Sequence, residues 1–427
     1  MFLKSFFGSQ SLKDFLNLFF ANIFQKFLGL VRELVIAFFL GSSILYANFL
    51  LLRVVADFFS QITAGNALKA NLLPKFTKLY DQYSDISLIQ IFKFSKESSI
   101  YLFLISQIIQ TFVIFYLQLQ NDLLFFIASF ILSFSICFNF INAIFLSILQ
   151  ARGLFLRYSY ASVSNSLVFT LLVYPLISMF SFIGLAFSRL LGIISMNIAF
   201  VKPMRNENIG KEVELKYSDF NFPTLVLGNF ANIIIISSRF VSGLDGSNDI
   251  TFFMYAVVIL NAFLTSIISN ISTILLRKIS IQENKKLMVY SLLISLSIGS
   301  LMILTLNFFS LDIIKFVYLR GIFSLSDAQQ TSVYLYDLSF GFLLLFVSTI
   351  LFQPFLSLSI FENKRTRFRL AVSFIVVLLL SSILVLLVPD FSSKERALSV
   401  MYISSFAAVV LSVYSYLKYL KYLKHER

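Results

Sequence analysis

The chain is poor in the residue types that build metal centres, disulfides and catalytic clusters. Its 427 residues include a single cysteine, Cys137, and a single histidine, His425. One cysteine excludes an intramolecular disulfide and a cysteine-based metal cluster. One histidine in the C-terminal tail excludes a histidine-ligated metal and a histidine-dependent triad. The sequence also has no phosphate-binding glycine loop and no nucleotide motif. We therefore expect no catalytic residues, no metal site and no cofactor, and the protein is predicted not to be an enzyme.

Charged residues are also scarce, at 13% of the chain, whereas hydrophobic residues make up 58% and the mean hydropathy is +0.88. A soluble domain is about a quarter charged, so this chain has far more apolar sequence than one buried core can use. Its apolar runs are continuous rather than alternating, which favours membrane-spanning helices over a β-barrel. The predicted fold class is an all-α polytopic membrane protein.

About twelve apolar segments have the length, about 20 residues, that a helix needs to cross a bilayer. The first lacks a small-residue cleavage site and is too long for the core of a signal peptide, so we expect it to be retained. The predicted spans are residues 15–40, 46–67, 99–117, 123–149, 158–180, 182–201, 220–241, 251–276, 287–309, 333–361, a segment ending at residue 389, and 397–417.

Basic residues gather in alternate connections between these spans and in the C-terminal tail. Because loops rich in lysine and arginine stay in the cytoplasm, both termini of this multi-pass protein are predicted to be cytoplasmic. The same loops account for the net charge of +13. We therefore expect membrane lipids as partners and no nucleic acid.

The chain also shows a faint internal repeat. The turn Leu40-Gly41-Ser42-Ser43 before one apolar run is similar to Leu244-Asp245-Gly246-Ser247 before another. This predicts two parallel six-helix lobes, residues 1–201 and 218–427, joined by a cytoplasmic linker at residues 202–217. Parallel repeats are typical of transporters in which the substrate site lies in a central cavity between the halves.

Charged residues lie inside the first two spans, where each costs about 2.5–3.5 kcal/mol on insertion scales. Lys26, Arg32 and Glu33 are in the first span, and Arg53 and Asp57 are in the second. In a structural interpretation the acids neutralise the bases, through pairs such as Arg53 with Asp57. In a functional interpretation the excess of bases binds an anion, especially phosphate, which arginine recognises with two donors at once.

Two further arginines, Arg189 and Arg239, fall near predicted span ends. There a long basic side chain can extend to the membrane interface without any further role.

Several of these segments resemble the MurJ (MviN) family of lipid II flippases, part of the multidrug, oligosaccharidyl-lipid and polysaccharide exporter superfamily. The segment from Lys26 to Glu33, followed by Leu40-Gly41, is similar to the family's first helix, and Arg53 falls where the family has an arginine in its second helix. Further similar segments are Asn66-Ala67-Leu68 with Pro74, Arg239-Phe240-Val241-Ser242, Arg320-Gly321-Ile322-Phe323 and Asn363-Lys364-Arg365-Thr366.

The resemblance implies two six-helix lobes around a cavity, alternating access, and a lipid-linked diphosphate as the substrate. By position, it implies that Lys26, Arg32 and Arg53 bind this substrate. We expect Arg239 to take part in substrate binding as well, and Glu33 and Asp57 to tune the charge or act as a latch. The implied function is the flipping of a polyprenyl-diphosphate-linked sugar, with the peptidoglycan precursor lipid II as first choice. Proteins of cell-wall or envelope polysaccharide synthesis are the implied protein partners.

The chain departs from the family at three positions and in length. Tyr46 and Gly65 stand where the family has acidic residues, and Val258 stands where it has an arginine. The family usually has fourteen helices, two more than predicted here. An O-antigen or capsule repeat-unit flippase therefore stays open as an alternative. So do a cation-coupled small-molecule exporter and a non-transporting membrane scaffold.

Overall fold

The computed structural model describes residues 9–64, 66–83, 86–119, 122–198, 200, 211–264, 268, 285–352 and 364–425. Contacts divide the chain into two compact units. The first contains Met1–Leu40 and Val55–Asn221, and the second contains Gly41–Val54 and Phe222–Arg427.

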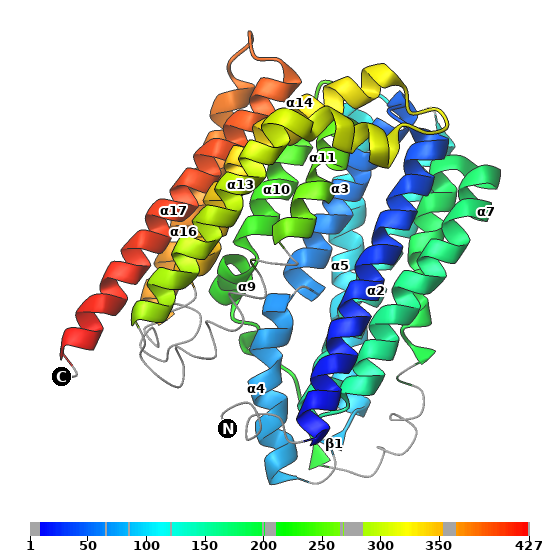
Figure 1. Cartoon of the computed structure of the whole chain (residues 1–427). Coiled ribbons are helices and arrows are strands. Elements are labelled where there is room, and N and C mark those ends of the chain that lie inside the picture. The colour runs from blue at the N-terminus through cyan, green and yellow to red at the C-terminus, as the bar shows by residue number, and fades with distance from the viewer. Residues whose placement is uncertain are drawn as a thin grey trace. The chain divides into compact units, whose positions relative to one another are not determined.

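The first unit is a helical bundle in which α2 packs on α7, α5 packs on α6, and α6 also contacts α4 and α7 (Figure 1). Its helices are α2 (Ser9–Leu40), the second half of α3 (Ile44–Ala64), α4 (Asn66–Gln82), α5 (Ile89–Tyr116), α6 (Leu123–Ala151) and α7 (Phe155–Ser195). Two short parallel strands, β1 (Ile86–Ser87) and β2 (Lys211–Glu212), pair beside the bundle.

The long element α7 is two helices joined by a tight turn. Ser181 has φ 53° and ψ −135°, which no helix allows. The chain turns back so closely that a Cβ atom on Gly184 would lie 1.9 Å from the carbonyl oxygen of Leu176, so only glycine fits there. The turn lies between the predicted spans 158–180 and 182–201, and the sequence therefore located it correctly.

A polar layer joins α5 to α6 in the interior of the first unit. The Ser106 hydroxyl donates to Ser133 Oγ at 2.9 Å, and the Gln110 amide donates to the same oxygen at 3.0 Å. One turn away, the Gln107 amide donates to Ser129 Oγ at 3.0 Å. Interhelical hydrogen bonds of this kind join membrane helices that lipid would not otherwise press together.

The segment after α7 docks on the first unit. The Phe220 ring stacks on Phe94 with centroids 5.7 Å apart, and Lys75 forms an ion pair with Asp219 in the short 3-10 helix η1 (Tyr217–Asp219). Of the predicted linker, residues 202–210 lie outside the described residues.

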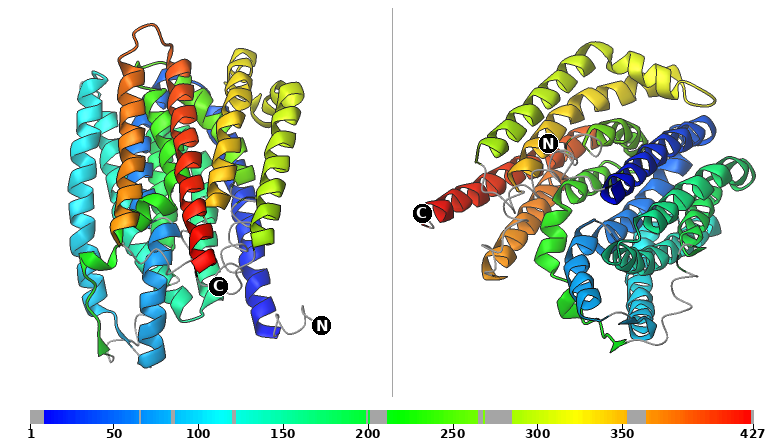
Figure 2. Two further views of the ribbon diagram at one scale, coloured as in Figure 1. Left: turned by 90° about the vertical axis from the view of Figure 1, so that its left-hand side faces the viewer. Right: turned by 60° about the horizontal axis from the view of Figure 1, so that its bottom comes forward.

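The second unit is also a helical bundle. Helix α14 packs on α11, α13 and α17, and α17 also packs on α10 and α16 (Figure 2). Besides the first half of α3, its helices are α9 (Phe222–Gly228), α10 (Phe230–Val241), α11 (Asp249–Phe263), α13 (Lys285–Tyr318), α14 (Leu325–Leu351), α16 (Lys364–Leu386) and α17 (Ser393–His425).

Residues 41–54 belong to the second unit because they are bonded to it. The Tyr255 hydroxyl donates to the carbonyl oxygen of Gly41 at 2.8 Å, and the Ser42 hydroxyl donates to Asp327 Oδ1 at 2.6 Å. The sequence assigned this stretch to the first lobe, so the contact-based units differ from the predicted lobes here. The lobe boundaries themselves stay a prediction.

The predicted continuous helix at residues 220–241 is broken in the structure. Helices α9 and α10 meet at Asn229 with a bend of 71°. The buried Asn229 amide donates to the carbonyl oxygen of Leu225 at 3.0 Å. An asparagine that bonds its own backbone competes with the helical hydrogen bonds, which gives this break a local cause.

The described residues contain 8 helices long and apolar enough to cross a membrane, or up to 9 if the bent pair counts as one span. Element α7 counts once in that set although it holds two of the predicted spans, and the charged helix α2 is not in the set. The prediction of an all-α polytopic membrane protein is confirmed. The ends of the predicted spans 251–276 and 333–361 lie partly outside the described residues.

Candidate functional site

Helix α2 carries three of the predicted site residues, and the structure separates them by burial. Glu33 is buried at 3% exposure, Arg32 is half-buried and Lys26 is exposed. The charged residues of this helix therefore lie in different surroundings, from the exposed Lys26 to the buried Glu33. A Cβ atom on Gly29 would meet only Arg32 Nη2, at 3.8 Å, so this glycine makes no close helix contact.

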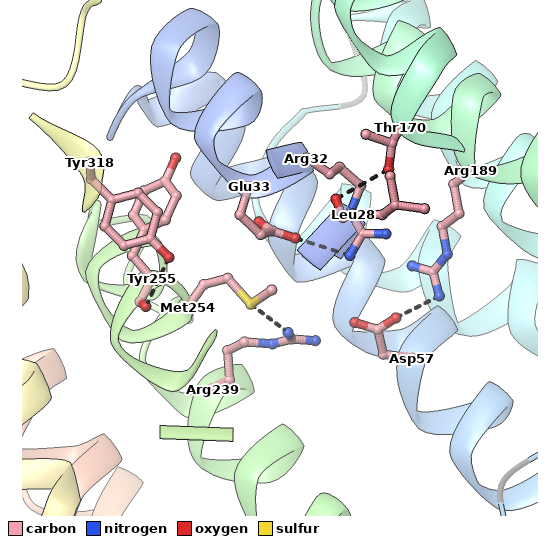
Figure 3. A network of polar contacts seen from close by, with 10 residues as sticks. All are labelled: Leu28, Arg32, Glu33, Asp57, Thr170, Arg189, Arg239, Met254, Tyr255 and Tyr318. Atoms are coloured by element: carbon pink, nitrogen blue, oxygen red, sulfur yellow. Dashed lines mark hydrogen bonds and ion pairs between the residues drawn. The ribbon is translucent and has the colours of Figure 1, made fainter. Parts of the chain in front are cut away.

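Arg32 is oriented by an aromatic ring and a neighbouring acid. Its guanidinium carbon lies 4.4 Å from the centroid of the Phe169 ring on α7, and its Nη2 lies 3.5 Å from Glu33 Oε1 (Figure 3). Next to it, the Thr170 hydroxyl donates to the carbonyl oxygen of Leu28 at 3.2 Å, which joins α7 to α2. A guanidinium can stack on a ring and still donate hydrogen bonds from its edge.

Asp57 on α3 forms an ion pair with Arg189 on α7. The distance from Arg189 Nη2 to Asp57 Oδ1 is 2.7 Å, and the two side chains are 15% and 17% exposed (Figure 3). Arg189 was expected to extend to an interface, but it lies inside the bundle and ties α7 to α3.

Two of the ion pairs in the first unit involve predicted site residues, and they differ in length. A charge-assisted hydrogen bond normally spans about 2.7–2.9 Å. The Arg189–Asp57 bond has that length, whereas the Arg32–Glu33 contact, at 3.5 Å, is loose. The Arg189–Asp57 pair therefore makes the tighter bond, and the Arg32–Glu33 contact is the more easily exchanged of the two.

The second unit holds the other two predicted cations. Arg53 on α3 is 9% exposed and Arg239 on α10 is 5% exposed. Arg239 Nη1 donates to the thioether sulfur of Met254 on α11 at 2.9 Å (Figure 3). A thioether is a weak acceptor, so this contact orients the guanidinium without neutralising it.

The segment Arg320-Gly321-Ile322-Phe323 has a structural role in this unit. The Phe323 ring packs 5.3 Å from Tyr255 and 5.8 Å from Tyr318 in a buried aromatic cluster, and Ile322 lies against Gly41. Both glycines, Gly41 and Gly321, have positive φ, which explains the residue type in each turn. This cluster anchors the loop before α3.

Sequence reasoning missed a pocket inside the first unit, which we call the amide pocket. It is a cavity of about 200 Å³ whose polar lining is Gln25, Asn139, Asn142, Ser162 and Asn165. The sequence carried a signal: on α6 and on α7 two polar residues stand three positions apart within apolar helices, a spacing that puts them on one face. Among the described residues, no group of three or more histidine, cysteine, aspartate or glutamate side chains could hold a metal ion.

Comparison with known proteins finds similarity in structure rather than in sequence. No family model matches the chain, and no curated protein matches its sequence. A structure of the lipid II flippase MurJ in an inward closed conformation covers 93% of this chain and 86% of its own, with 19% identity and a TM-score of 0.73.

Transporters of another group are also similar. An inward-facing multidrug resistance MATE family transporter of the MOP superfamily covers 92% of this chain and 94% of its own, with 14% identity and a TM-score of 0.64. A MATE structure in the straight conformation covers 94% and 93%, with 12% identity and a TM-score of 0.61. The chain thus has the fold shared by the lipid II flippase MurJ and the MATE transporters, as the resemblance in its sequence predicted.

Proposed function

We propose that the chain is a flippase that moves a polyprenyl-diphosphate-linked sugar across the bacterial inner membrane by alternating access. Lipid II is the first choice of substrate because the MurJ structure, a lipid II flippase, is similar over 93% of this chain. Membrane lipids and proteins of cell-wall or polysaccharide synthesis are its partners, and both termini lie in the cytoplasm. The basic loops between the predicted spans support this orientation.

The observation that carries this proposal is the geometry of Arg32. Its guanidinium is stacked on Phe169 and only loosely bonded to Glu33. A substrate diphosphate accepts two parallel N–H bonds from a guanidinium and displaces the Glu33 carboxylate. Glu33 then acts as a placeholder that keeps the site occupied when substrate is absent.

The other predicted site residues have separate roles in the proposal. Lys26 is exposed and supplies a mobile point charge that attracts the anion before Arg32 binds it. Asp57 serves as a latch through Arg189. Substrate binding by Arg53 and Arg239 of the second unit stays a prediction, to be tested one residue at a time.

The test is flipping of fluorescent lipid II by the purified full chain in proteoliposomes. Arg32→Gln keeps a polar side chain but removes the charged fork, and a hydrogen bond to a charged group contributes about 1.5–3 kcal/mol. We expect flipping to fall by about 10- to 100-fold. Arg369→Gln, at an exposed position of α16, is the matched control and should flip normally. Normal flipping by Arg32→Gln would reject Arg32 as the diphosphate-binding residue.

A cation-coupled small-molecule exporter is the second candidate. The similarity to the multidrug MATE transporter supports it, because the structural match covers 92% of this chain and 94% of that transporter. Cationic dye efflux that depends on an ion gradient, without flipping of any lipid diphosphate, would favour this function. Replacing lipid II by an O-antigen or capsule repeat-unit lipid in the same vesicles tests the remaining flippase alternative.

A further inference from the structure

The amide pocket lies wholly within the first unit, and its lining is uncharged. It is formed by residues of α2, α3, α6 and α7, and every described residue that lines it is neutral. A phosphate or other ion would lose its hydration there without gaining an opposite charge, which is strongly unfavourable. The pocket therefore suits a neutral ligand rich in hydrogen-bonding groups.

Asn142 lines the pocket and has an incomplete set of hydrogen bonds. Its Nδ2 donates to the backbone carbonyl oxygen of Ile193 at 2.9 Å, and because a carbonyl only accepts, this bond fixes which way the amide points. The other amide atom, Oδ1, is buried and has no hydrogen-bond partner. An acceptor left in this state is costly, so a ligand that donates a hydrogen bond to it gains binding free energy.

The other polar groups of the lining come from three helices, and the Asn139 amide also donates to Ser60 Oγ at 3.3 Å. Asn139 and Asn142 are one turn apart on α6, and Ser162 and Asn165 are one turn apart on α7, so each helix presents a pair of polar groups to the cavity. Gln25 contributes a polar group to the lining from a third helix, α2. Amides and hydroxyls both donate and accept, as sugar hydroxyls do.

The size of the cavity selects among neutral ligands. Its volume of about 200 Å³ is well above the roughly 10–15 Å³ that one water needs, so the pocket has room for a small polar ligand such as one sugar ring. The space is too wide for its walls to surround a bare cation, whose oxygen ligands must approach to about 2.0–2.6 Å.

We propose that the amide pocket binds one sugar ring of the lipid-linked substrate. This inference rests on the proposed function and adds to it a division of labour. Arg32 recognises the diphosphate that all such lipids share, and the pocket distinguishes a lipid that carries a sugar from one that does not.

The test compares the binding of two lipids to the purified full chain in detergent: undecaprenyl diphosphate, and the same lipid with one N-acetylglucosamine attached. With two or three hydrogen bonds to the sugar, the wild type should bind the sugar-bearing lipid about tenfold more tightly. In Gln25→Leu and in Asn142→Leu, each of which removes one of these bonds, the preference should fall to about threefold or less. Gln107→Leu removes an amide of α5 outside the pocket and should keep the tenfold difference.

Two results overturn the inference: equal binding of both lipids by the wild type, or an unchanged tenfold preference in the pocket variants. If neither lipid binds, the proposed function fails, and free N-acetylglucosamine then tests the pocket alone. Saturation-transfer NMR should show contact between this sugar and the wild type that is lost in Gln25→Leu. Absence of that contact in the wild type would reject a sugar site altogether.

Discussion

The ion pair between Asp57 and Arg189 offers the sharpest test of how the first unit is held together. Both side chains are mostly buried and their nearest atoms are 2.7 Å apart. Arg189→Met removes the cation while keeping an unbranched side chain, so the Asp57 carboxylate stays inside the bundle with that partner gone. Asp57→Leu removes the anion and keeps the Arg189 cation. The double variant replaces both charges with apolar groups.

Breaking a buried ion pair by removing one partner costs about 3–5 kcal/mol. These side chains are still 15% and 17% exposed. We therefore expect each single variant to fall at the lower end of this range, with a loss of about 3 kcal/mol in the free energy of unfolding. The double variant removes both charges of the pair and should lose about 1 kcal/mol or less. The two losses are therefore strongly non-additive.

Reversible unfolding in mixed detergent micelles measures all three variants against the wild type. Lys75→Met is the matched control. Its ion pair with Asp219 joins α4 to η1, and the two side chains are 31% and 23% exposed. A more exposed pair contributes about 0.2–1 kcal/mol, so this change should be small. A double variant as unstable as the sum of the single variants would refute the reasoning, since the two residues would then act independently.

Three further substitutions test other parts of the structure. Gly184→Ala should prevent folding, because its Cβ atom would lie 1.9 Å from a backbone oxygen. Gly29→Ala, whose Cβ atom would make only an ordinary contact at 3.8 Å, should stay monodisperse by size-exclusion chromatography, and equal behaviour would contradict the turn geometry. Tyr255→Phe leaves the carbonyl at the loop before α3 without its buried donor and should cost about 1–2 kcal/mol in the same unfolding assay. The exposed Tyr290→Phe should cost nothing, so equal losses would exclude that bond as the cause. Phe169→Leu removes the ring beneath the guanidinium, a contact of about 0.5–1 kcal/mol, and should weaken lipid diphosphate binding about threefold; unchanged affinity would show that stacking does not orient the cation.

The helices could be predicted because their signal is local. Continuous apolar runs of about 20 residues mark spans whatever their neighbours are. The turn at Ser181 was found in the same way, from a short interruption between two such runs. The break at Asn229 was missed, since one asparagine in an apolar run is equally compatible with a straight helix.

The partners of the charged residues could not be predicted, because they depend on packing between distant segments. Asp57 and Arg189 are 132 positions apart, and spacing along one helix suggested Arg53 as the partner instead. Residues 41–54 illustrate the same limit. The hydrogen bond from Tyr255 to Gly41 joins segments 214 positions apart, so nothing local assigns that stretch to the second unit.

The amide pocket was detectable in part. The spacing of Asn139 and Asn142, repeated by Ser162 and Asn165, is visible in the sequence, but amides in membrane helices usually bond a neighbouring helix. Only the structure shows that Asn142 Oδ1 is left unpaired. The roles predicted for Lys26, Arg32, Arg53 and Arg239 stay predictions until the binding experiments are done.

The turn in α7 also affects how the protein can be studied and how it enters the membrane. Only Ser181 leaves the helical conformation there, so the two helices share almost no connecting chain. They have to be inserted together, as one hairpin, during synthesis. A reporter enzyme, epitope tag or protease site placed at this turn would separate the two helices. Topology mapping of this protein should therefore use single-cysteine labelling at the turn and keep larger insertions for the longer connections.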